Sequence, residues 1–200
     1  TPAGVTLYSC IAFSPDGTLF VAHSGNSETA WVFRLSGGAA SYVRTLSGMG
    51  ARGVFSPDGR YYVSANGSLL KRYRVDGGLF TQIFTISAET DLGLSGYTPT
   101  INEVAFSPDG KYLSVAISTV KSGGENLKIC KLTDDNYTVL KTPFGSTSVS
   151  GAYTCVAYSM DGTLLAVGLG ESNGAVLFGV SGETYTKKPF PSAEVGKAFS

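Results

Sequence analysis

The stretch Phe13-Ser14-Pro15-Asp16-Gly17 joins the end of an apolar segment to a tight turn, and it returns along the chain. It recurs unchanged at Phe55–Gly59 and Phe106–Gly110, and in altered form as Tyr158-Ser159-Met160-Asp161-Gly162. Another copy begins at Ala198-Phe199-Ser200. The copies lie about 40–50 residues apart, which is the period of propeller blades and too long for leucine-rich or ankyrin repeats.

The Ser-Pro-Asp-Gly part of each copy has the chemistry of a turn. Proline presets the φ angle of the second turn position, glycine accepts a positive φ, and the aspartate side chain accepts hydrogen bonds from nearby backbone N–H groups. Because the motif recurs in every repeat, we interpret its aspartates as turn residues rather than catalytic acids. The predicted turn residues are Pro15, Asp16, Gly17, Pro57, Asp58, Gly59, Pro108, Asp109, Gly110, Asp161 and Gly162.

Each repeat contains four short segments rich in β-branched and aromatic residues, and none has helical periodicity. Such a repeat predicts a four-stranded antiparallel blade and therefore an all-β protein with a β-propeller fold. The expected blades cover residues 8–46, 51–86, 102–142 and 153–190, and a fifth starts at 197–200. Four blades and the start of a fifth favour one propeller domain, or part of one, that belongs to a larger ring.

Composition excludes several classes of partner. Fifteen basic residues balance fifteen acidic ones, which argues against nucleic-acid binding and against a basic membrane-binding face. No apolar run approaches the roughly 18 residues of a membrane span, so no membrane insertion is expected. The three cysteines are scattered without metal-ligand spacing. We therefore expect neither a metal nor a cofactor.

The repeated Ala-Phe-Ser-Pro-Asp-Gly segment resembles the inner hairpin of WD40 and YVTN-type β-propellers. The Trp-Asp pair of WD40 repeats is replaced here, for example by Phe33-Arg34 and Tyr73-Arg74. The segments at 12–24, 31–36 and 176–187 resemble repeats found in bacteriophage and bacterial propellers. That resemblance implies a virion component, of a tail, fibre or head decoration.

On this basis we expect an interaction platform without enzymatic activity, located in a virion. Its partners would be other virion or surface proteins, or a host receptor or glycan. Two alternatives stay open. One is a propeller enzyme, lactonase-like or glycan-cleaving, and the other is a secreted bacterial propeller at the extracellular face or cell surface.

Loop length indicates which face would bind. The connections 87–102, 118–126 and 143–154 vary most in length and share one face of the expected propeller, and insertions on one face of a repeat protein often form its binding surface. The alternative is that these loops pack between blades or against another chain. The candidate binding residues are Glu89, Asp91, Tyr97, Lys121, Glu125, Asn126 and Tyr153.

No catalytic constellation is apparent in the sequence. His23 is the one histidine, and we expect it at the rim, hydrogen-bonded to a neighbour. Cys10, Cys130 and Cys155 occupy positions that are apolar in other repeats, which predicts small core side chains. The pair Lys71-Arg72 is expected to be solvated or paired across strands.

Overall fold

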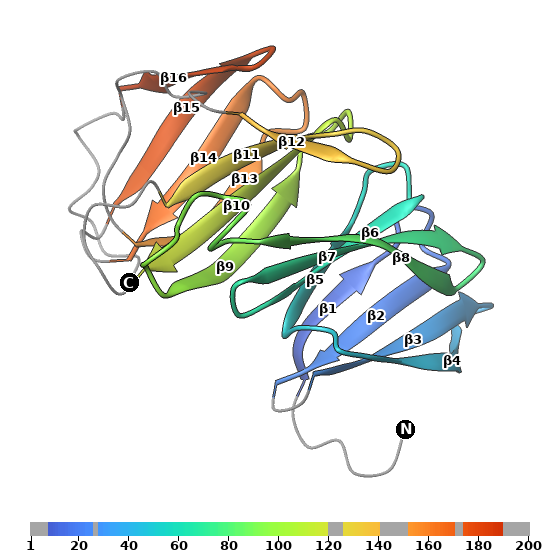
Figure 1. Ribbon diagram of the computed structural model, residues 1–200. Coiled ribbons are helices and arrows are strands. Elements are labelled where there is room, and N and C mark those ends of the chain that lie inside the picture. Colours follow the sequence, from blue (N-terminus) through green and yellow to red (C-terminus); the bar gives the residue numbers. More distant parts are fainter. Residues whose placement is uncertain (1–7, 26–27, 120–125, 141–151, 171–173, 190–200) are drawn as a thin grey trace, which may run out of the picture.

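The computed structural model describes residues 8–25, 28–119, 126–140, 152–170 and 174–189. In these ranges the chain forms sixteen strands and no helix. The strands build four separate four-stranded antiparallel sheets, each made of consecutive strands. Figure 1 shows the sheets following one another from the N-terminal end to the C-terminal end, like blades of a fan.

Each blade is numbered by its place in the chain. Blade 1 contains β1 (Tyr8–Phe13), β2 (Leu19–Ser24), β3 (Thr29–Ser36) and β4 (Ala39–Ser47). Blade 2 contains β5 (Arg52–Phe55), β6 (Tyr61–Asn66), β7 (Leu69–Asp76) and β8 (Leu79–Ser87). Blade 3 contains β9 (Pro99–Phe106), β10 (Tyr112–Thr119), β11 (Leu127–Leu132) and β12 (Tyr137–Val139). Blade 4 contains β13 (Tyr153–Tyr158), β14 (Leu164–Leu169), β15 (Ala175–Ser181) and β16 (Thr184–Lys188). The expected start of a further blade at 197–200 lies outside the described residues.

The turn between the first two strands has the same hydrogen bonds in every blade. In blade 1 the Ser14 hydroxyl donates to Asp16 over 2.5 Å, and Asp16 accepts the Thr18 backbone N–H over 3.0 Å. Gly17 has a φ of 69° and its N–H donates to the Ser14 carbonyl, a conformation that favours glycine. Equivalent serine–aspartate bonds join Ser56 to Asp58, Ser107 to Asp109 and Ser159 to Asp161.

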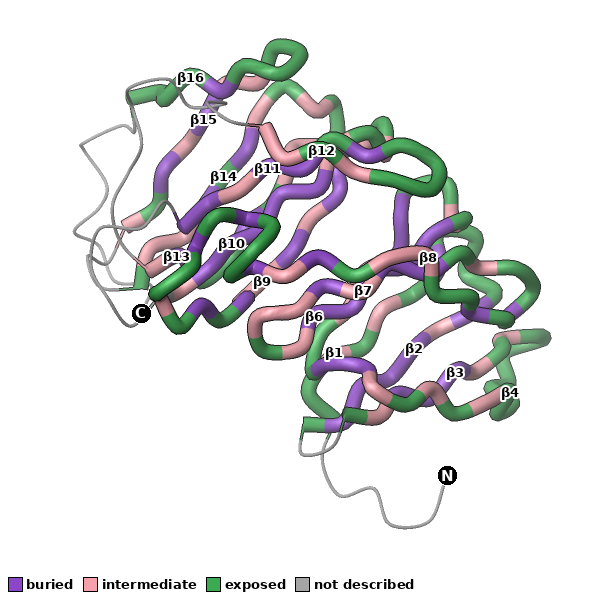
Figure 2. The backbone as a smooth tube through the Cα atoms, viewed as in Figure 1, coloured by how far each residue is buried: buried purple, intermediate pink, exposed green. Residues whose placement is uncertain are grey.

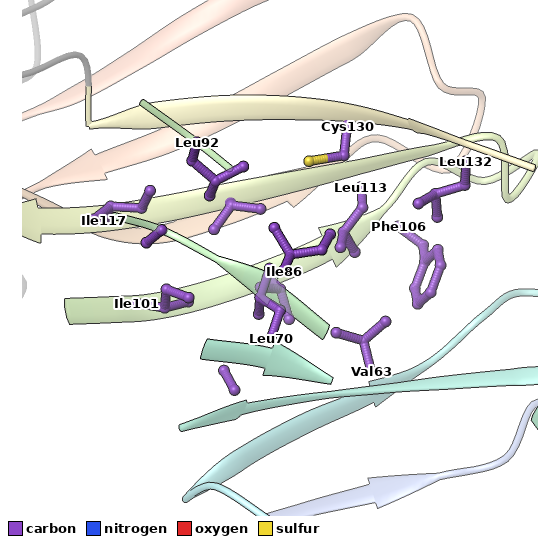
Figure 3. Close-up of a cluster of buried hydrophobic side chains, with 14 of the residues drawn as sticks. Val63, Leu70, Ile86, Leu92, Ile101, Phe106, Leu113, Ile117, Cys130 and Leu132 are labelled. Atoms are coloured by element: carbon purple, nitrogen blue, oxygen red, sulfur yellow. The ribbon is translucent and has the colours of Figure 1, made fainter. Parts of the chain in front are cut away.

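Neighbouring blades pack face to face through apolar side chains. The largest cluster joins blade 2 to blade 3 and includes Val63, Leu70 and Ile86 on one side and Phe106 and Leu113 on the other, as Figure 3 shows. Figure 2 shows buried residues concentrated along the strands and exposed ones at the turns. Since each sheet buries its faces against adjacent sheets, hydrophobic burial stabilises the stack of blades rather than any single blade.

Charged contacts at the rim connect the third strand of one blade to the following blade. The Arg34 guanidinium donates to the Gly77 carbonyl, Arg74 pairs with Asp135, and Lys131 pairs with Glu183. These contacts are exposed, so each adds little stability.

Arg72 differs from the expectation of a solvated residue. It is 4% exposed, its guanidinium lies 3.9 Å from the centre of the Tyr61 ring, and it donates to the Thr133 carbonyl of blade 3. A cation–π contact and a charge-assisted hydrogen bond compensate part of its loss of water, while its Nε atom is buried without a hydrogen-bond partner among the described residues.

His23 is also buried, which corrects the expectation of a rim residue. It is fully inaccessible to solvent; Nδ1 lies 2.5 Å from the Gly50 carbonyl oxygen, and Nε2 lies 2.5 Å from the Tyr62 hydroxyl of blade 2. Burial lowers the pKa of His23, since desolvation penalises the charged imidazolium, although the contact with Gly50 opposes this. His23 therefore acts as a packing residue between blades 1 and 2.

The cysteines divide into two groups. Cys130 is buried as expected, and burial raises the pKa of its thiol to about 12. Cys10 is only half-buried and Cys155 is exposed. The expectation of a core position is therefore wrong for Cys155, because its strand lies on the outermost described blade, where no further sheet covers it.

Gly50 marks the closest approach between the link from blade 1 and the sheet of blade 2. A Cβ atom at this position would lie 1.5 Å from the Ala65 carbonyl oxygen, which is a rigid backbone atom. We expect Gly50→Ala to lower the free energy of unfolding by about 3 kcal/mol, at the upper end of overpacking costs. Urea unfolding followed by tryptophan fluorescence measures the change, because Trp31 lies in blade 1.

Gly170→Ala is the matched control for this substitution. Its Cβ would meet the terminal methyl carbon of Thr154 at 3.1 Å, and that side chain can move. Equal destabilisation by the two substitutions would contradict a specific backbone clash at Gly50.

Acid should weaken the turn of blade 4. Hydrogen bonds from Ser159 and Thr163 lower the pKa of Asp161 from 3.8 to about 2. The unfolded chain therefore binds the proton first, so this contribution to stability is present above about pH 4 and is lost as the pH falls toward 2. Thermal unfolding between pH 2 and pH 6, covering that window, should show a shallower pH dependence for Asp161→Asn than for the natural chain. Glu89→Gln, outside the turns, serves as control, and an unchanged slope in Asp161→Asn would contradict this role.

Candidate functional site

The predicted loop surface is only partly exposed. Glu89 is exposed in the segment that follows β8. Asp91 is exposed too, but its carboxylate accepts the Ser87 backbone N–H over 2.7 Å and so holds the turn. Tyr97 is half-buried and packs against the cluster between blades 2 and 3.

Two other predicted residues lie in the interior. Tyr153 is 2% exposed, and its backbone carbonyl accepts a hydrogen bond from the Asn102 side chain over 2.6 Å. Asn126 is 5% exposed. Lys121 and Glu125 lie outside the described residues. The structure therefore brings Glu89 and Asp91 together on one segment, and the assignment of this face to partner binding stays a prediction.

A cavity of about 500 Å³ lies at the opposite face, between the turns of blades 3 and 4. This volume falls within the range of small-molecule sites. Three tyrosines, Tyr112, Tyr158 and Tyr185, line it, and Tyr185 is the most deeply buried of them at 1% exposure. Two carboxylates, Asp109 and Asp161, border it from the adjacent turns.

The tyrosine hydroxyls form a chain across the blade interface. The Ser114 hydroxyl of blade 3 donates to the Tyr158 hydroxyl over 2.7 Å, and the Tyr158 and Tyr185 hydroxyls lie 2.8 Å apart. Burial raises the pKa of Tyr158, because a phenolate would lose its hydration. The pKa of Tyr185 is raised for the same reason, and Tyr158 adds to the effect. Both phenols therefore stay neutral and can donate or accept hydrogen bonds.

The carboxylates of this site remain charged at neutral pH. Asp109 has a lowered pKa because its hydrogen bonds from Ser107 and the Lys111 backbone outweigh the opposing effect of partial burial. A carboxylate stabilised in this way is a good acceptor of hydrogen bonds and a weak proton acceptor. Asp109 and Asp161 are therefore suited to holding a ligand's hydroxyl groups.

Comparison of equivalent repeat positions shows what distinguishes this interface. Three wall positions are occupied by tyrosine here, whereas the interface between blades 1 and 2 has apolar residues that cannot form hydrogen bonds. Of the three interfaces between described blades, the one between blades 3 and 4 has a hydroxyl at all three positions and the other two do not. The three sets of equivalents are Leu19, Tyr61 and Tyr112; Phe55, Phe106 and Tyr158; and Phe80, Tyr137 and Tyr185.

The cavity between blades 1 and 2 is smaller and differently charged. It measures about 200 Å³, and Arg34 and Arg60 line it beside Asp16 and Asp58. The residues that line the cavity between blades 3 and 4 include no cation, but the ammonium of the neighbouring Lys111 lies 3.5 Å from Asp109 Oδ2. Two carboxylates, one of them paired with an exposed lysine, and three phenols favour a neutral ligand rich in hydroxyl groups over an anionic one.

Two kinds of feature are absent from the part of the chain that the structure describes. Within the described ranges no three His, Cys, Asp or Glu side chains gather into a group that could hold a metal ion. Among these same residues, no helix is long and apolar enough to cross a membrane.

The sequence matches one family model in part. The model of the WD domain, G-beta repeat, matches residues 90–124. No curated protein matches the chain.

Several solved structures are similar to this one over most of the chain. A Lactobacillus plantarum protein has a TM-score of 0.72 at 18% identity, with 91% of this chain and 54% of that one covered. A candidate 6-phosphogluconolactonase from Bacteroides uniformis has a TM-score of 0.68 at 22% identity, with coverages of 90% and 52%. The periplasmic gluconolactonase of Pseudomonas aeruginosa has a TM-score of 0.65 at 19% identity, with coverages of 86% and 49%. This chain thus spans about half the length of these structures.

These neighbours correct the expectation that the chain has no enzymatic activity, because two of the structures just described bear the names of lactonases. That expectation rested on the symmetry of the repeats, and the tyrosine wall between blades 3 and 4 shows that equivalent positions do not carry equivalent chemistry. At these identities the likeness establishes the fold. The prediction from the repeats is confirmed: the chain is built as a β-propeller of four-stranded antiparallel blades.

Proposed function

We propose that this chain is part of a propeller that hydrolyses a neutral sugar lactone, and that the cavity between blades 3 and 4 binds the sugar. The observation that carries the proposal is the wall of three tyrosines and two aspartates, found at this one interface with all three hydroxyls. The lactonases among the structural neighbours support the reaction class.

The wall provides both kinds of contact that a sugar needs. Tyrosine rings pack against the apolar faces of a sugar ring, and their hydroxyls pair with its hydroxyl groups. The carboxylates of Asp109 and Asp161 accept further hydrogen bonds, which are stronger because the acceptor is charged. A cavity of about 500 Å³ accommodates a single sugar ring.

The charge of the cavity distinguishes between the two lactones that appear in the names of the similar structures, a phosphorylated one and an unphosphorylated one. A phosphorylated lactone carries negative charge, and in this cavity it would face the carboxylates of Asp161 and of Asp109, of which Asp109 has the Lys111 ammonium 3.5 Å away. Like charges repel each other. The unphosphorylated lactone is therefore the favoured substrate.

Hydrolysis of a lactone forms one bond to the carbonyl carbon and breaks another. Water attacks the lactone carbonyl carbon, and the ester bond to the ring oxygen breaks. One proton of the water passes to that oxygen, and the other is released to the solvent when the new carboxylic acid ionises. The product is an open-chain hydroxy acid with a carboxylate. In this scheme Tyr158 and Asp109 orient the sugar, which places the carbonyl for attack.

Three expectations stay predictions from the sequence: the bacteriophage origin, the virion location, and contact with other virion or surface proteins. Among the partners expected there, a glycan is the one whose hydroxyl-rich chemistry fits the tyrosine wall.

Hydrolysis of glucono-1,5-lactone by the 200-residue chain tests the proposal directly. We expect ring opening faster than in buffer alone, with saturation at high lactone concentration, and weaker activity on the 6-phospho derivative. A pH-indicator assay follows the acid released, and heat-denatured protein is the blank. A rate equal to the blank with both lactones, or a preference for the phosphorylated one, would contradict the proposal.

Tyr158→Phe changes the site with little change in side-chain shape, because equivalent positions in other blades carry phenylalanine at Phe55 and Phe106. Circular dichroism checks that the fold tolerates loss of the hydrogen bond from Ser114. Loss of one neutral hydrogen bond of about 1 kcal/mol should weaken binding of 1,5-anhydroglucitol, a neutral sugar ring without the lactone carbonyl, about fivefold. Saturation-transfer NMR at increasing 1,5-anhydroglucitol concentration measures the change. Tyr8→Phe, which also removes a single hydroxyl but lies far away in β1, should leave binding unchanged.

A further inference from the structure

His23 differs from the other residues at its place in the repeat. It pairs with Cys10 across the first two strands of blade 1. The equivalent residues of the other described blades are small: Ala65, Ala116 and Gly168. A small side chain is therefore enough for packing at this position, and the imidazole adds hydrogen bonds that packing does not require.

The partner of His23 in blade 2 departs from the repeat as well. Tyr62 stands where the other described blades have apolar side chains, and its hydroxyl lies 2.5 Å from Nε2 of His23. Those apolar equivalents are Phe20, Leu113 and Leu165. Both members of the pair are 0% exposed. Among the described interfaces, the one between blades 1 and 2 thus has a buried polar pair at positions that are apolar elsewhere.

The backbone link between blades 1 and 2 is held by the same histidine. The carbonyl oxygen of Gly50 lies 2.5 Å from Nδ1 of His23, and the Gly50 N–H donates to the Ser64 hydroxyl over 2.9 Å. Met49, the preceding residue, is 0% exposed. One residue of the link is therefore held by a side chain from each of the two blades.

The two partners of His23 decide which ring nitrogen carries the proton. The Gly50 carbonyl oxygen can only accept a hydrogen bond, so Nδ1 must carry the hydrogen that faces it. In the neutral ring Nε2 then has a lone pair, and the Tyr62 hydroxyl donates to it. The neutral imidazole thus satisfies both partners.

Protonation of His23 would break this arrangement. An imidazolium carries hydrogens on both nitrogens, so the hydrogen on Nε2 would point at the Tyr62 oxygen and the hydroxyl would lose its acceptor. The pair is closely packed, since a Cβ atom built on Gly53 would clash with the Tyr62 hydroxyl and would lie 2.7 Å from His23 Nε2. A buried cation and a buried hydroxyl without an acceptor are both costly.

The surroundings of His23 provide no buried anion that would stabilise the imidazolium. None of the described aspartates and glutamates is buried. Phenols and thiols carry no charge in weakly acidic solution. Burial lowers the pKa of His23, and the contact with Gly50 opposes this effect. The elements packed around His23 carry these titratable groups: Cys10 on β1, the exposed Glu28 before β3, the exposed Arg52 on β5, Tyr62 on β6, and Lys71 and Tyr73 on β7.

We propose that His23 is a pH-sensitive clamp between blades 1 and 2. The neutral imidazole holds blade 1 to the link through Gly50 and to blade 2 through Tyr62, and its protonation in weakly acidic solution loosens this interface. Loosening exposes the apolar cluster between the two blades, which includes Phe55 and Phe80. This clamp does not depend on the lactone reaction or on the cavity between blades 3 and 4.

NMR of the natural chain labelled with 15N-histidine tests the arrangement, because the chain has one histidine. We expect the proton on Nδ1 in neutral solution. We also expect a neutral ring in the folded protein at pH 6.5, where about half of the imidazoles of an unfolded chain are charged. A proton on Nε2, or a titration midpoint at the ordinary value, would overturn the proposal.

The pH dependence of stability tests the energetic consequence. The unfolded chain binds the proton first, so the contribution of His23 is complete above its ordinary pKa and is lost as the pH falls through that value. The folding equilibrium constant should fall about tenfold between about pH 7.5 and about pH 5.5. Urea unfolding followed by the fluorescence of Trp31 measures this fall.

Two variants assign the fall to the clamp. His23→Gln should remove it, because an amide donates and accepts hydrogen bonds but is not protonated in this range. Asp161→Asn should keep it, because that carboxyl acts below about pH 4. Equal falls in the two variants would refute the assignment. The NMR titration decides on the natural chain if His23→Gln does not fold.

Amide hydrogen exchange then locates the opening. As the pH is lowered over the same range, and after correction for the intrinsic exchange rate, residues 48–66 around the link should lose protection before residues 153–169 of blade 4. Equal loss in both segments would mean that the whole chain unfolds, and it would overturn a clamp confined to one interface.

Discussion

Packing of one sheet against the next is the interaction on which this structure depends. A four-stranded antiparallel sheet has two faces, and in blade 2 both are buried: Tyr62 and Tyr73 on one side, Val63 and Leu70 on the other. No blade has an interior of its own, so each is stable only beside a neighbour. The rim contacts and the buried Arg72 and His23 orient the sheets, while the apolar clusters provide most of the free energy.

Much of this arrangement could be predicted because it repeats. The turn beginning at Ser14 recurs, so its proline, aspartate and glycine, and the strands on either side, are readable from the sequence. The burial of His23 and Arg72 could not be predicted from the repeat in the same way. Each has a partner in a neighbouring blade, Tyr62 for His23 and Thr133 for Arg72, and single-repeat patterns say nothing about such contacts.

The candidate site illustrates the same limit. The variable loop lengths predict a binding surface on one face of the propeller, but Tyr153 and Asn126 are buried there. The cavity lies at the other face, where the turns are uniform. A signal was present in the sequence: Tyr158 stands where three repeats have phenylalanine. In a repeat protein the residue that departs from the common pattern carries more information about function than the pattern itself.

The turn that defines the repeat also bears on the chemical lifetime of the protein. An Asp-Gly step can form isoaspartate when the glycine nitrogen attacks the aspartate side-chain carbon, because glycine has no side chain to hinder the attack. Here the Gly17 N–H is held by the Ser14 carbonyl, and the Asp16 carboxylate is turned toward Thr18. Gly59, Gly110 and Gly162 are held in the same way. In the four described blades the turn thus holds the two groups that would have to meet in this reaction, whereas an unfolded chain leaves them free to meet.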